Sequence, residues 1–502
     1  METPTLFLSI VLVILFCICV LKINSSSRKA SKLPPGPYPL PVIGNIFQLG
    51  GVFHVSLAEL SKTYGSLMTI HLGSRTTFVV SSSDIAKQIL SKHEHLFIRR
   101  PVTDASRALD HDKFSAIWLP ATSGQWRNLR KLCKEQIFSS ERLNSSQGLR
   151  QEKMQQLRNY LQECCNTGKV VNICEAAFTT SLNLTSNTIF SVDFADYGSS
   201  SSQELKEIVT GVMKSLGAPN VSDFLPFLKY IDPLGIRRQA KYYLGKLFQS
   251  FDDLITQRLQ ERRTSLDYSR KDDFLETLLD LTEQEGAEWR YQDIKHLILD
   301  LIYAGTETTS LTVEWAMTEL LRNPGKLRKA RDEIKEVIGH NNIVQESDIS
   351  RLPYLQALVK ETFRLHPVVS VLVKLPEEDV KVEQSVVPKG GQIFVNIWAI
   401  GRDPSQWPNP DAFVPERFLS KEIDVKGQHF ELLPFGTGRR ICLGMPLAHR
   451  MLHLMLATLL HKFDWKLEDG IRPEDIDMAE RFCGTVQKAV PLKAIPILDY
   501  ST

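Results

Sequence analysis

One long helical pattern, between Tyr291 and Arg322, restricts the possible folds of this chain more than any other feature. It covers about 32 residues, which corresponds to roughly 48 Å at the helical rise. Its middle, residues 298–304, is too apolar to lie on a surface, and the pattern stops at Asn323, where proline and glycine follow. The sequence therefore predicts a long central helix inside a large core. A chain of 502 residues, 43% of them hydrophobic, can supply that core.

A polar cluster, Gly305-Thr306-Glu307-Thr308-Thr309, interrupts this apolar pattern. Burying a carboxyl group costs free energy unless the group has a partner or a use. A glycine inside a helix costs about 1 kcal/mol relative to alanine. Two interpretations stay open from these residues alone. Either the hydroxyls bond back to the helix and form a structural kink, or a distortion opens a cavity and places hydroxyl and carboxyl groups beside it.

A second island, residues 435–444, places one cysteine between glycines. Cys442 follows two arginines and precedes a helical pattern from Met445 to Lys462, and both features are expected to lower the pKa of its thiol. A nucleophilic cysteine and a soft metal ligand both fit. A zinc site is disfavoured, because no other cysteine lies within about 40 residues. A thiolate beside arginines better suits a large anionic cofactor, with the sulfur on its metal and the arginines on its carboxylates.

Charge and cysteine content exclude several other classes of protein. Lys and Arg number 60 against 58 Asp and Glu, so the net charge of +2 gives no electrostatic reason to expect a nucleic-acid partner. Eight cysteines in 502 residues do not make a disulfide scaffold. His449 and His453 have metal-ligand spacing, but no acid lies between them and no third ligand is evident. We interpret these two histidines as packing or surface residues.

An apolar run from Leu6 to Val20 predicts a membrane anchor. The uncharged stretch has about 19 residues, close to the ~20 that cross a bilayer. Glu2 precedes it and four basic residues follow it, whereas a cleaved signal peptide has the opposite order. Basic flanks stay in the cytosol, so the rest of the chain is expected there. We predict three parts: an anchor at 1–22, a polar and proline-rich hinge at 23–41, and one cytosolic domain at 42–502.

The cysteine island also carries a family resemblance. Phe435, Gly438, Arg440, Cys442 and Gly444 resemble the haem-binding signature of the cytochrome P-450 haem-thiolate monooxygenases. Four further segments resemble other motifs of this family and occur in the family's order. Trp126 to Arg130 resembles its Trp-x-x-x-Arg motif, and 304–309 resembles its oxygen-activation motif. Residues 361–364 resemble its Glu-x-x-Arg helix, and 415–418 resemble the arginine segment that pairs with that helix. The anchor and hinge resemble those of plant microsomal members, which implies the endoplasmic reticulum membrane.

The resemblance implies a haem b cofactor held by the matched residues. Cys442 is expected to be the axial ligand of the haem iron. Four basic or aromatic side chains are expected to hold the haem propionates: Trp126, Arg130, Arg440 and, more weakly, Arg100. Gly438 and Gly444 are expected to let the loop turn tightly and the next helix approach the haem.

The resemblance also implies a catalytic pair and a supporting network. Thr308, aided by Glu307, is expected to guide protons to bound O2, while NADPH supplies electrons through NADPH–cytochrome P-450 reductase. Glu361, Arg364 and Arg417 are expected to form a buried ion-pair network that supports the cysteine loop.

The implied fold is mainly α: a large helical domain with a long central helix, a small β-rich lobe and one N-terminal transmembrane helix. Because positions 126, 308 and 442 must converge on one cofactor, the catalytic part is expected to be a single domain. Alternating apolar residues at 67–72 and 77–80, divided by Gly73-Ser74, predict a strand pair in the β-rich lobe.

The whole chain is similar to plant terpenoid hydroxylases, the group that contains geraniol hydroxylases and ferruginol-synthase-like diterpene oxidases. This implies hydroxylation of an apolar terpenoid, in the first place a diterpenoid. A monoterpenoid (geraniol-like) hydroxylase and a reductase-independent haem-thiolate isomerase or dehydratase are the alternatives, and the intact Glu307-Thr308 pair argues against the latter. The matching pocket positions are mainly apolar: Phe114, Trp118, Tyr303, Ala304, Val369, Val371, Leu372 and Phe482.

The chain departs from its relatives at residues 371–376, where they usually carry a Pro-Arg pair and one more residue. This shortening is expected to reshape the roof of the pocket and to remove a propionate contact, unless Lys374 replaces it.

Overall fold

The computed structural model describes residues 33–197, 203–264, 269–284 and 289–498. The predicted anchor at 1–22 and the first part of the hinge lie outside these described residues, so the three-part division stays a prediction. Within the described ranges, no helix is long and apolar enough to cross a bilayer.

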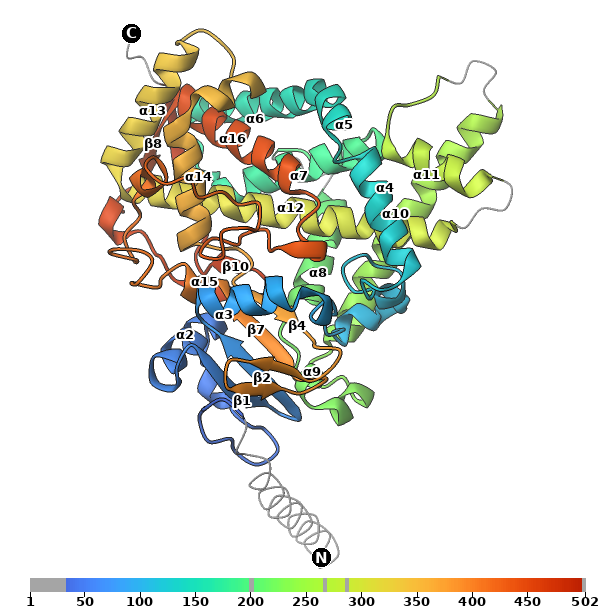
Figure 1. The fold of residues 1–502 in the computed structure, drawn as a ribbon. Helices are drawn as coiled ribbons and strands as arrows, with labels where there is room; N and C mark the ends of the chain where they lie inside the picture. The colour runs from blue at the N-terminus through green and yellow to red at the C-terminus, as the bar shows by residue number, and fades with distance from the viewer. Residues whose placement is uncertain (1–32, 198–202, 265–268, 285–288, 499–502) are drawn as a thin grey trace, which may run out of the picture.

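Helices dominate the structure, as predicted (Figure 1). The long helix α12 has the expected bounds, Tyr291–Arg322, and crosses the middle of the helical part. The α-helices are α2 Phe53–Tyr64, α3 Ser83–Lys87, α4 Gly124–Gln136, α5 Ser140–Ser145, α6 Gln147–Thr167, α7 Ile173–Phe190, α8 Gln203–Gly217, α9 Val221–Phe224, α10 Ile236–Thr264, α11 Phe274–Glu283, α12, α13 Pro324–Ile338, α14 Pro353–Leu365, α15 Ile397–Ile400 and α16 Met445–His461.

Two hydrophobic clusters bury α12 along its length. Its C-terminal half, including Val313 and Leu320, packs with buried residues of α6, α7, α13, α14 and α16. Its N-terminal half, including Leu297 and Ile302, packs with buried residues of α4, α8, α10 and α11. Burial in both clusters explains why apolar residues occupy several faces of α12 rather than one stripe.

The β-rich lobe lies in the lower part of Figure 1 and is built on a four-stranded sheet of order β1-β2-β7-β4. The predicted strand pair is confirmed: β1 and β2 are antiparallel, and Gly73-Ser74 forms their turn. Strand β2 runs parallel to β7, which brings Thr77 beside Gln392. The strands are β1 Leu67–Leu72, β2 Arg75–Val80, β3 Val171–Asn172, β4 Val371–Lys374, β5 Val380–Val382, β6 Ser385–Val387, β7 Gln392–Asn396, β8 Phe463–Leu467, β9 Glu480–Phe482, β10 Val486–Lys488 and β11 Lys493–Leu498.

Short 3-10 or π turns connect these elements. They are η2 Ile46–Leu49, η3 Gln88–Lys92, η4 Glu94–Leu96, η5 Ala105–Lys113, η6 Pro226–Tyr230, η7 Glu346–Arg351, η8 Pro415–Phe418, η9 Gly438–Arg440 and η10 Pro473–Asp475. The segment around η5 runs in the left-handed region at Leu109 (φ 52°) and Asp110 (φ 58°), so it is a bent loop rather than one helix.

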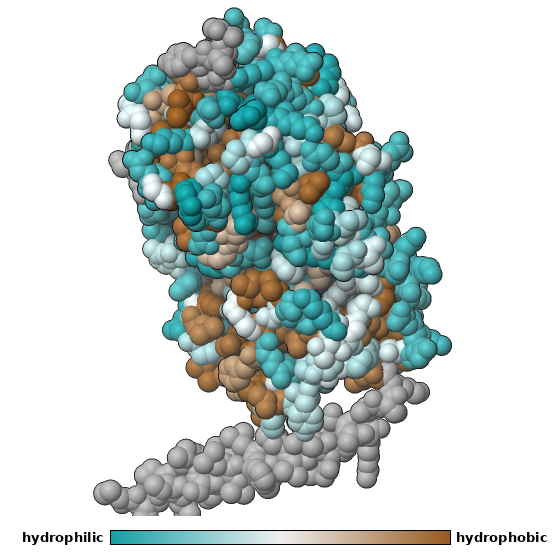
Figure 2. All heavy atoms as spheres, turned by 90° about the vertical axis from the view of Figure 1, so that its left-hand side faces the viewer, coloured by the Kyte–Doolittle hydropathy of each residue, from teal (hydrophilic) through white to brown (hydrophobic). Residues whose placement is uncertain are grey.

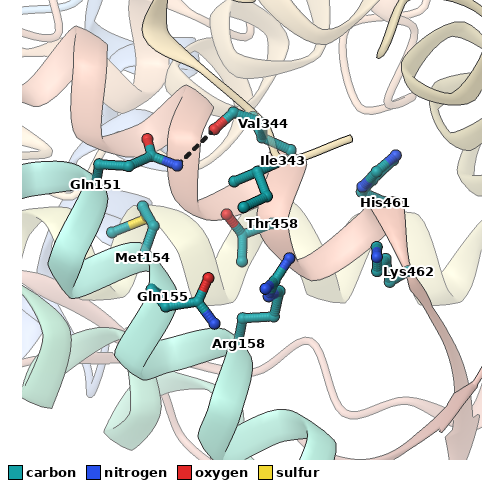
Figure 3. Close-up of a pocket in the computed structure, with 9 residues that line it drawn as sticks. All are labelled: Gln151, Met154, Gln155, Arg158, Ile343, Val344, Thr458, His461 and Lys462. Carbon is teal, nitrogen blue, oxygen red and sulfur yellow. Dashed lines mark hydrogen bonds between the residues drawn. The ribbon is translucent and has the colours of Figure 1, made fainter. Parts of the chain in front are cut away.

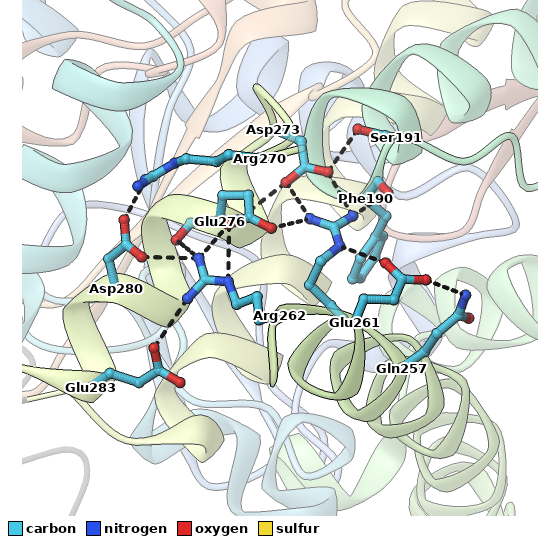
Figure 4. Close-up of polar contacts among 11 residues, drawn as sticks. Phe190, Ser191, Gln257, Glu261, Arg262, Arg270, Asp273, Glu276, Asp280 and Glu283 are labelled. Carbon is cyan, nitrogen blue, oxygen red and sulfur yellow. Dashed lines mark hydrogen bonds and ion pairs between the residues drawn. The ribbon is translucent and has the colours of Figure 1, made fainter. Parts of the chain in front are cut away.

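Ion pairs fix α11 to α10 (Figure 4). Arg258, 4% exposed, donates to Asp273 at 2.8 Å and to Glu276 at 2.9 Å. Arg262 continues the network to Glu276, Asp280 and Glu283. Since the Asp273 carboxylate also caps α11, this network holds the helix at its N-terminus.

Candidate active site

The cysteine loop is a tight turn between η9 and α16. Gly438 has φ 68°, and a side chain there would meet the Glu94 carboxylate, whose oxygen accepts a hydrogen bond from the Arg439 backbone N–H. The backbone conformation at 438 therefore favours glycine, and a larger residue would also displace the Glu94 side chain. Gly444 has an ordinary φ of −77°, so its turn does not require glycine, but a Cβ there would lie 3.8 Å from the Cys442 sulfur.

The Cys442 side chain is exposed, yet it lies deep among protein atoms. The two observations agree when the sulfur faces a space inside the protein rather than its outer surface. Burial raises the pKa of the Cys442 thiol, while the Gly444 and Met445 N–H groups and the cations of Arg130 and Arg100 act to lower it. The expectation of a lowered thiol pKa is wrong for the protein part alone, because desolvation outweighs the positive neighbours.

The polar cluster of α12, like the Cys442 sulfur, borders an open space. Ala304 and Gly305 are exposed, although Leu297 to Leu299 and Ile302 are fully buried just before them. The Thr308 hydroxyl donates to the Ala304 carbonyl at 2.7 Å, and the Thr309 hydroxyl donates to that of Gly305 at 3.1 Å. Both hydroxyls therefore bond to backbone carbonyls of their own helix, as the structural interpretation of this cluster expects. Helix α12 remains helical through the cluster. The exposed backbone at 304–305 agrees with the other interpretation, a wall of a cavity.

Four cations gather between the cysteine loop and α12. Burial lowers the pKa of Arg440 to about 9, helped by Arg100 and Arg130. Burial also lowers the pKa of Lys374 to about 7, helped by Arg100 and Arg440, against a smaller opposite effect of Glu94. Within the described residues, neither Arg100 nor Lys374 has a hydrogen-bond or ion-pair partner. The pocket between Lys374, Arg440 and Glu94 holds about 10 Å³, the space of one water.

Arg100 connects this group of cations to the cysteine loop and to α12. Burial and Arg130 lower the pKa of Arg100, whereas Cys442 and Asp300 of α12 act to raise it. Arg100 therefore lies near the cysteine sulfur and near a carboxylate of the central helix. Arg100 thus joins the surroundings of Cys442 to α12, while the single-domain division stays a prediction.

Three of the four predicted propionate ligands have protein partners. The Trp126 indole N–H donates to the Ala116 carbonyl at 3.1 Å, so the expected free N–H is not found. Arg440 donates to the carbonyls of Ile98, Ile117 and Leu119, and Arg130 donates to that of Ile441 at 2.9 Å. These bonds tie the segment 114–119 and the cysteine loop to one cation cluster. Sequence reasoning missed them because the acceptors are backbone atoms, distant in the chain.

The predicted Glu361–Arg364–Arg417 network is present. Arg364 and Glu361 are fully buried and form two hydrogen bonds, at 2.7 and 2.8 Å. Arg417 adds a contact to Glu361 at 3.3 Å. Arg364 also donates to the carbonyls of Gly401, Pro410 and Ala412, so it organises the segment before the cysteine loop. Its link to the loop itself is indirect: the Phe363 ring packs edge-on against Phe435 at 5.2 Å.

The predicted substrate positions lie on several elements. Phe114 stacks on His296 at 4.9 Å between ring centroids, and Phe482 packs against Phe53 at 5.8 Å. Tyr303 and Ala304 lie on α12 next to the catalytic pair, and Val371 and Leu372 begin β4. The remaining two, Trp118 and Val369, are half-buried.

Sequence reasoning overlooked Asp300. Its carboxylate accepts from the Ser115 hydroxyl at 2.6 Å and from the Ala116 N–H at 2.7 Å, and burial raises its pKa to about 7. Asp300 thus holds the segment 114–119 against α12. The signal was present, because a carboxyl group stood in the otherwise apolar run at 298–304.

His449 and His453 do not form a metal site. His453 is buried and its Nδ1 contacts the His449 carbonyl, which agrees with a packing role. Within the described residues, no group of three or more potential ligands could hold a metal ion.

A separate surface pocket lies beside α6 and the C-terminal end of α16 (Figure 3). It holds about 20 Å³ and includes Arg158, Thr458 and His461. Since Thr458 and Cys442 are separated by most of α16, at about 1.5 Å per residue, the pocket is remote from the cysteine.

The donor set fits a haem. The thiol of Cys442 has the cations of Arg130 and Arg100 near it, and Arg440 and Lys374 lie beside Arg100. An iron ion would stabilise the thiolate, and the propionates would neutralise the cations. A protein with this fold and site belongs to the haem-thiolate class. The family model of cytochrome P450 matches residues 34–495, so the chain belongs to this family. It is a cytochrome P450 monooxygenase that uses haem, O2 and reductase-supplied electrons from NADPH.

Its curated relatives come from plants. Cytochrome P450 76T24 of Catharanthus roseus is 55% identical over 473 residues, which is 94% of both chains. A ferruginol synthase of Isodon rubescens is 49% identical over 99% of this chain and 100% of its own length. A carnosic acid synthase of Rosmarinus officinalis is 49% identical over 93% of both chains. This chain thus resembles complete P450 enzymes from end to end.

Lys374 gives a pH-dependent prediction. A lysine whose folded pKa is near 7, against 10.5 when unfolded, makes the unfolded chain bind more protons between these values. The stability of the haem-free protein is therefore expected to rise between pH 7 and pH 9, and Lys374→Met is expected to reduce this rise. Urea unfolding at each pH measures it. Equal pH slopes in both proteins would show that neither burial nor the neighbouring arginines depress the pKa of Lys374.

Proposed function

We propose that this monooxygenase hydroxylates an apolar plant terpenoid, specifically a diterpenoid. The observation that carries the proposal is the near full-length similarity to a ferruginol synthase and a carnosic acid synthase, at 49% identity each. The half-buried, mainly apolar side chains of Phe114, Trp118 and Leu372 suit a hydrocarbon-like guest held by shape.

In this reaction the residues of the chain bind the cofactor and position the reacting groups. The haem, when bound, supplies the redox chemistry and the O2 binding. Cys442 would hold its iron, while Arg100, Arg130, Arg440 and Lys374 would neutralise its propionates. The half-buried apolar side chains of Phe114, Trp118 and Leu372 would exclude water. Thr308 and Glu307 would hold protons beside the exposed backbone of Ala304 and Gly305. Burial raises the pKa of Glu307 to about 7, so this carboxyl can take up and release a proton near neutral pH.

The substrate test uses the purified protein with reductase, NADPH and O2. A set of diterpene and monoterpene scaffolds is supplied, and products are analysed by mass spectrometry. Hydroxylation of a diterpene scaffold is the expected result. Turnover of geraniol-like substrates alone would replace the diterpenoid assignment with the monoterpenoid one, and product formation without NADPH would indicate an isomerase or dehydratase.

We also propose that the protein is anchored in the endoplasmic reticulum membrane with the catalytic domain in the cytosol. Large apolar side chains are exposed on two segments, one with Tyr38 and Phe47 and the other with Phe227 and Tyr230. Both segments meet at the β1–β2 turn, where Gly73 N–H donates to Ile43 and Ser74 N–H to Phe224. Figure 2 shows hydrophobic residues gathered at this sheet-bearing end. Release of the protein from microsomes by salt alone would refute the anchor.

For the reductase we propose a basic face beside the thiol. Arg127, Lys131 and Lys134 are exposed on α4, and Arg439 is exposed on η9. Arg130 joins these elements through its bond to Ile441. An acidic reductase surface is expected to dock there, so the rate of reduction falls as salt increases; a salt-independent rate would contradict this contact.

Thr308→Ala is expected to separate electron consumption from product formation. Removing the hydroxyl should lower the product formed per NADPH by about tenfold or more, since positioned proton donors contribute roughly 10²–10⁴-fold. Product and NADPH are measured in the same reaction. Thr309→Ala is the matched control, because Thr309 forms the same back-bond but is buried. Equal product per NADPH in Thr308→Ala and in the parent protein would remove Thr308 from the proton path.

A further inference from the structure

The hairpin of β9 and β10 reaches from the surface to the acid of α12. Gln487 of β10 donates from its amide nitrogen to the Glu307 carboxylate at 2.7 Å. Arg481 of β9, directly opposite in the hairpin, is exposed and donates to the amide oxygen of Gln487 at 3.1 Å. Both ends of the amide are therefore engaged, one inward and one outward.

The structure fixes this hairpin in place. Glu480 at the start of β9 bonds to the buried His54 at 2.6 Å. The Val486 N–H donates to the Val368 carbonyl at 2.8 Å. At the turn, Gly484 lies so close to Gly217 at the end of α8 that a Cβ on Gly484 would be 2.7 Å from its backbone. Gln487 thus stands on a rigid element and cannot easily move away from Glu307.

Among the residues that the structure describes, no cation forms an ion pair with Glu307, and Arg481 bonds to the Gln487 amide rather than to the carboxylate. Burial raises its pKa, and only the hydrogen bonds from Thr485 and Gln487 oppose this effect. The other ionisable groups that sense its charge are Tyr303 on α12 and Cys174 on α7, and Glu314 lies further along α12 beside Cys174. None of these groups is basic. Two neutral donors, the Thr485 hydroxyl and the Gln487 amide, therefore hold this buried carboxylate, and the Gln487 bond is 2.7 Å long.

We propose that Gln487 is a positioning residue for the proton supply: it holds the Glu307 carboxyl at the edge of the cavity, while Arg481 fixes the other end of the amide from the solvent side. This proposal rests on the proposed function. The proton balance is simple, since a proton taken up by the carboxylate from solvent leaves it toward the cavity, and the carboxyl returns to its first state. No oxidant or reductant is involved in this step.

Two substitutions with opposite expected effects test the proposal. Gln487→Leu removes the donor, so the pKa of Glu307 is expected to rise by roughly one unit, the size of one hydrogen bond. Gln487→Lys supplies a cation, so this pKa is expected to fall by a similar amount. Infrared spectroscopy of the carboxyl stretch against pH measures the pKa in the haem-bearing protein, and Glu307→Gln identifies the band.

The second readout is the product formed per NADPH. Gln487→Leu is expected to lower it by about fivefold or more, with KM for the substrate unchanged, because the acid and not the pocket is affected. Arg481→Met, which removes only the outer bond of the amide, is the matched variant and is expected to give a smaller loss. Melting temperatures near that of the parent protein show that the hairpin is intact.

Each outcome is decisive. An unchanged Glu307 pKa in both Gln487 variants, or an unchanged product yield per NADPH with a shifted pKa, overturns the proposal. A rise in KM without a loss of coupling would assign Gln487 to the substrate pocket instead. If the parent protein lacks a thiolate-ligated haem, the proposed function fails, whereas the infrared comparison still reports on the Gln487–Glu307 contact.

Discussion

Replacing Arg364 by alanine is expected to destabilise the folded protein severely, by about 3–5 kcal/mol. The substitution leaves the fully buried Glu361 carboxylate without its bidentate partner and removes donors from the carbonyls of Gly401, Pro410 and Ala412. Breaking one partner of a buried ion pair costs about 3–5 kcal/mol. Since whole proteins are stable by roughly 5–15 kcal/mol, this loss is a large fraction of the total. Soluble yield and the urea midpoint of unfolding measure the effect.

Arg417→Ala is the matched comparison for this prediction. Arg417 contacts the same carboxylate at 3.3 Å, but its side chain is partly exposed and its other acceptors lie near the surface. A smaller shift of the urea midpoint is therefore expected. A parent-like midpoint for Arg364→Ala would show that the network does not support the fold.

Replacing Cys442 by alanine is expected to remove all detectable monooxygenase activity while the protein still folds. The sulfur is exposed to the interior space. The loop around it is held by backbone and ring contacts, among them the Cys442 N–H to the Phe435 carbonyl at 3.0 Å. Loss of the iron ligand therefore removes the chemistry but few folding contacts.

Activity and folding are measured separately for this variant. Product formation with reductase and NADPH measures activity, and the thermal midpoint of the haem-free proteins measures folding. A midpoint near that of haem-free parent protein is expected. Residual product in Cys442→Ala at a tenth of the parent rate or more would assign the iron ligand to another residue.

The elements predictable from the sequence are those fixed by local patterns. The bounds of α12 follow from its apolar middle and from the proline and glycine after Asn323. The β1–β2 pair follows from alternation and a Gly-Ser turn, and the Glu361–Arg364 pair needs only helical spacing. In each case the partner is a few residues away, so the pattern in the chain already contains the contact.

The unpredicted features depend on residues far apart in the chain. Arg440 bonds to carbonyls at 98, 117 and 119, and Asp300 bonds to the backbone of 116, which no side-chain pattern can indicate. The sign of the Cys442 pKa shift was missed because burial is a property of the whole fold. Gln487 was missed for the same reason, since its hairpin meets α12 only in the folded protein.

The absorption spectrum of the purified parent protein, reduced and bound to carbon monoxide, tests the central claim most directly. That claim is that Cys442 presents a thiolate to the iron of a haem held between the cysteine loop and α12. The expected result is the red-shifted Soret band that a thiolate ligand produces. A colourless protein, or a band typical of a nitrogen ligand, would contradict it.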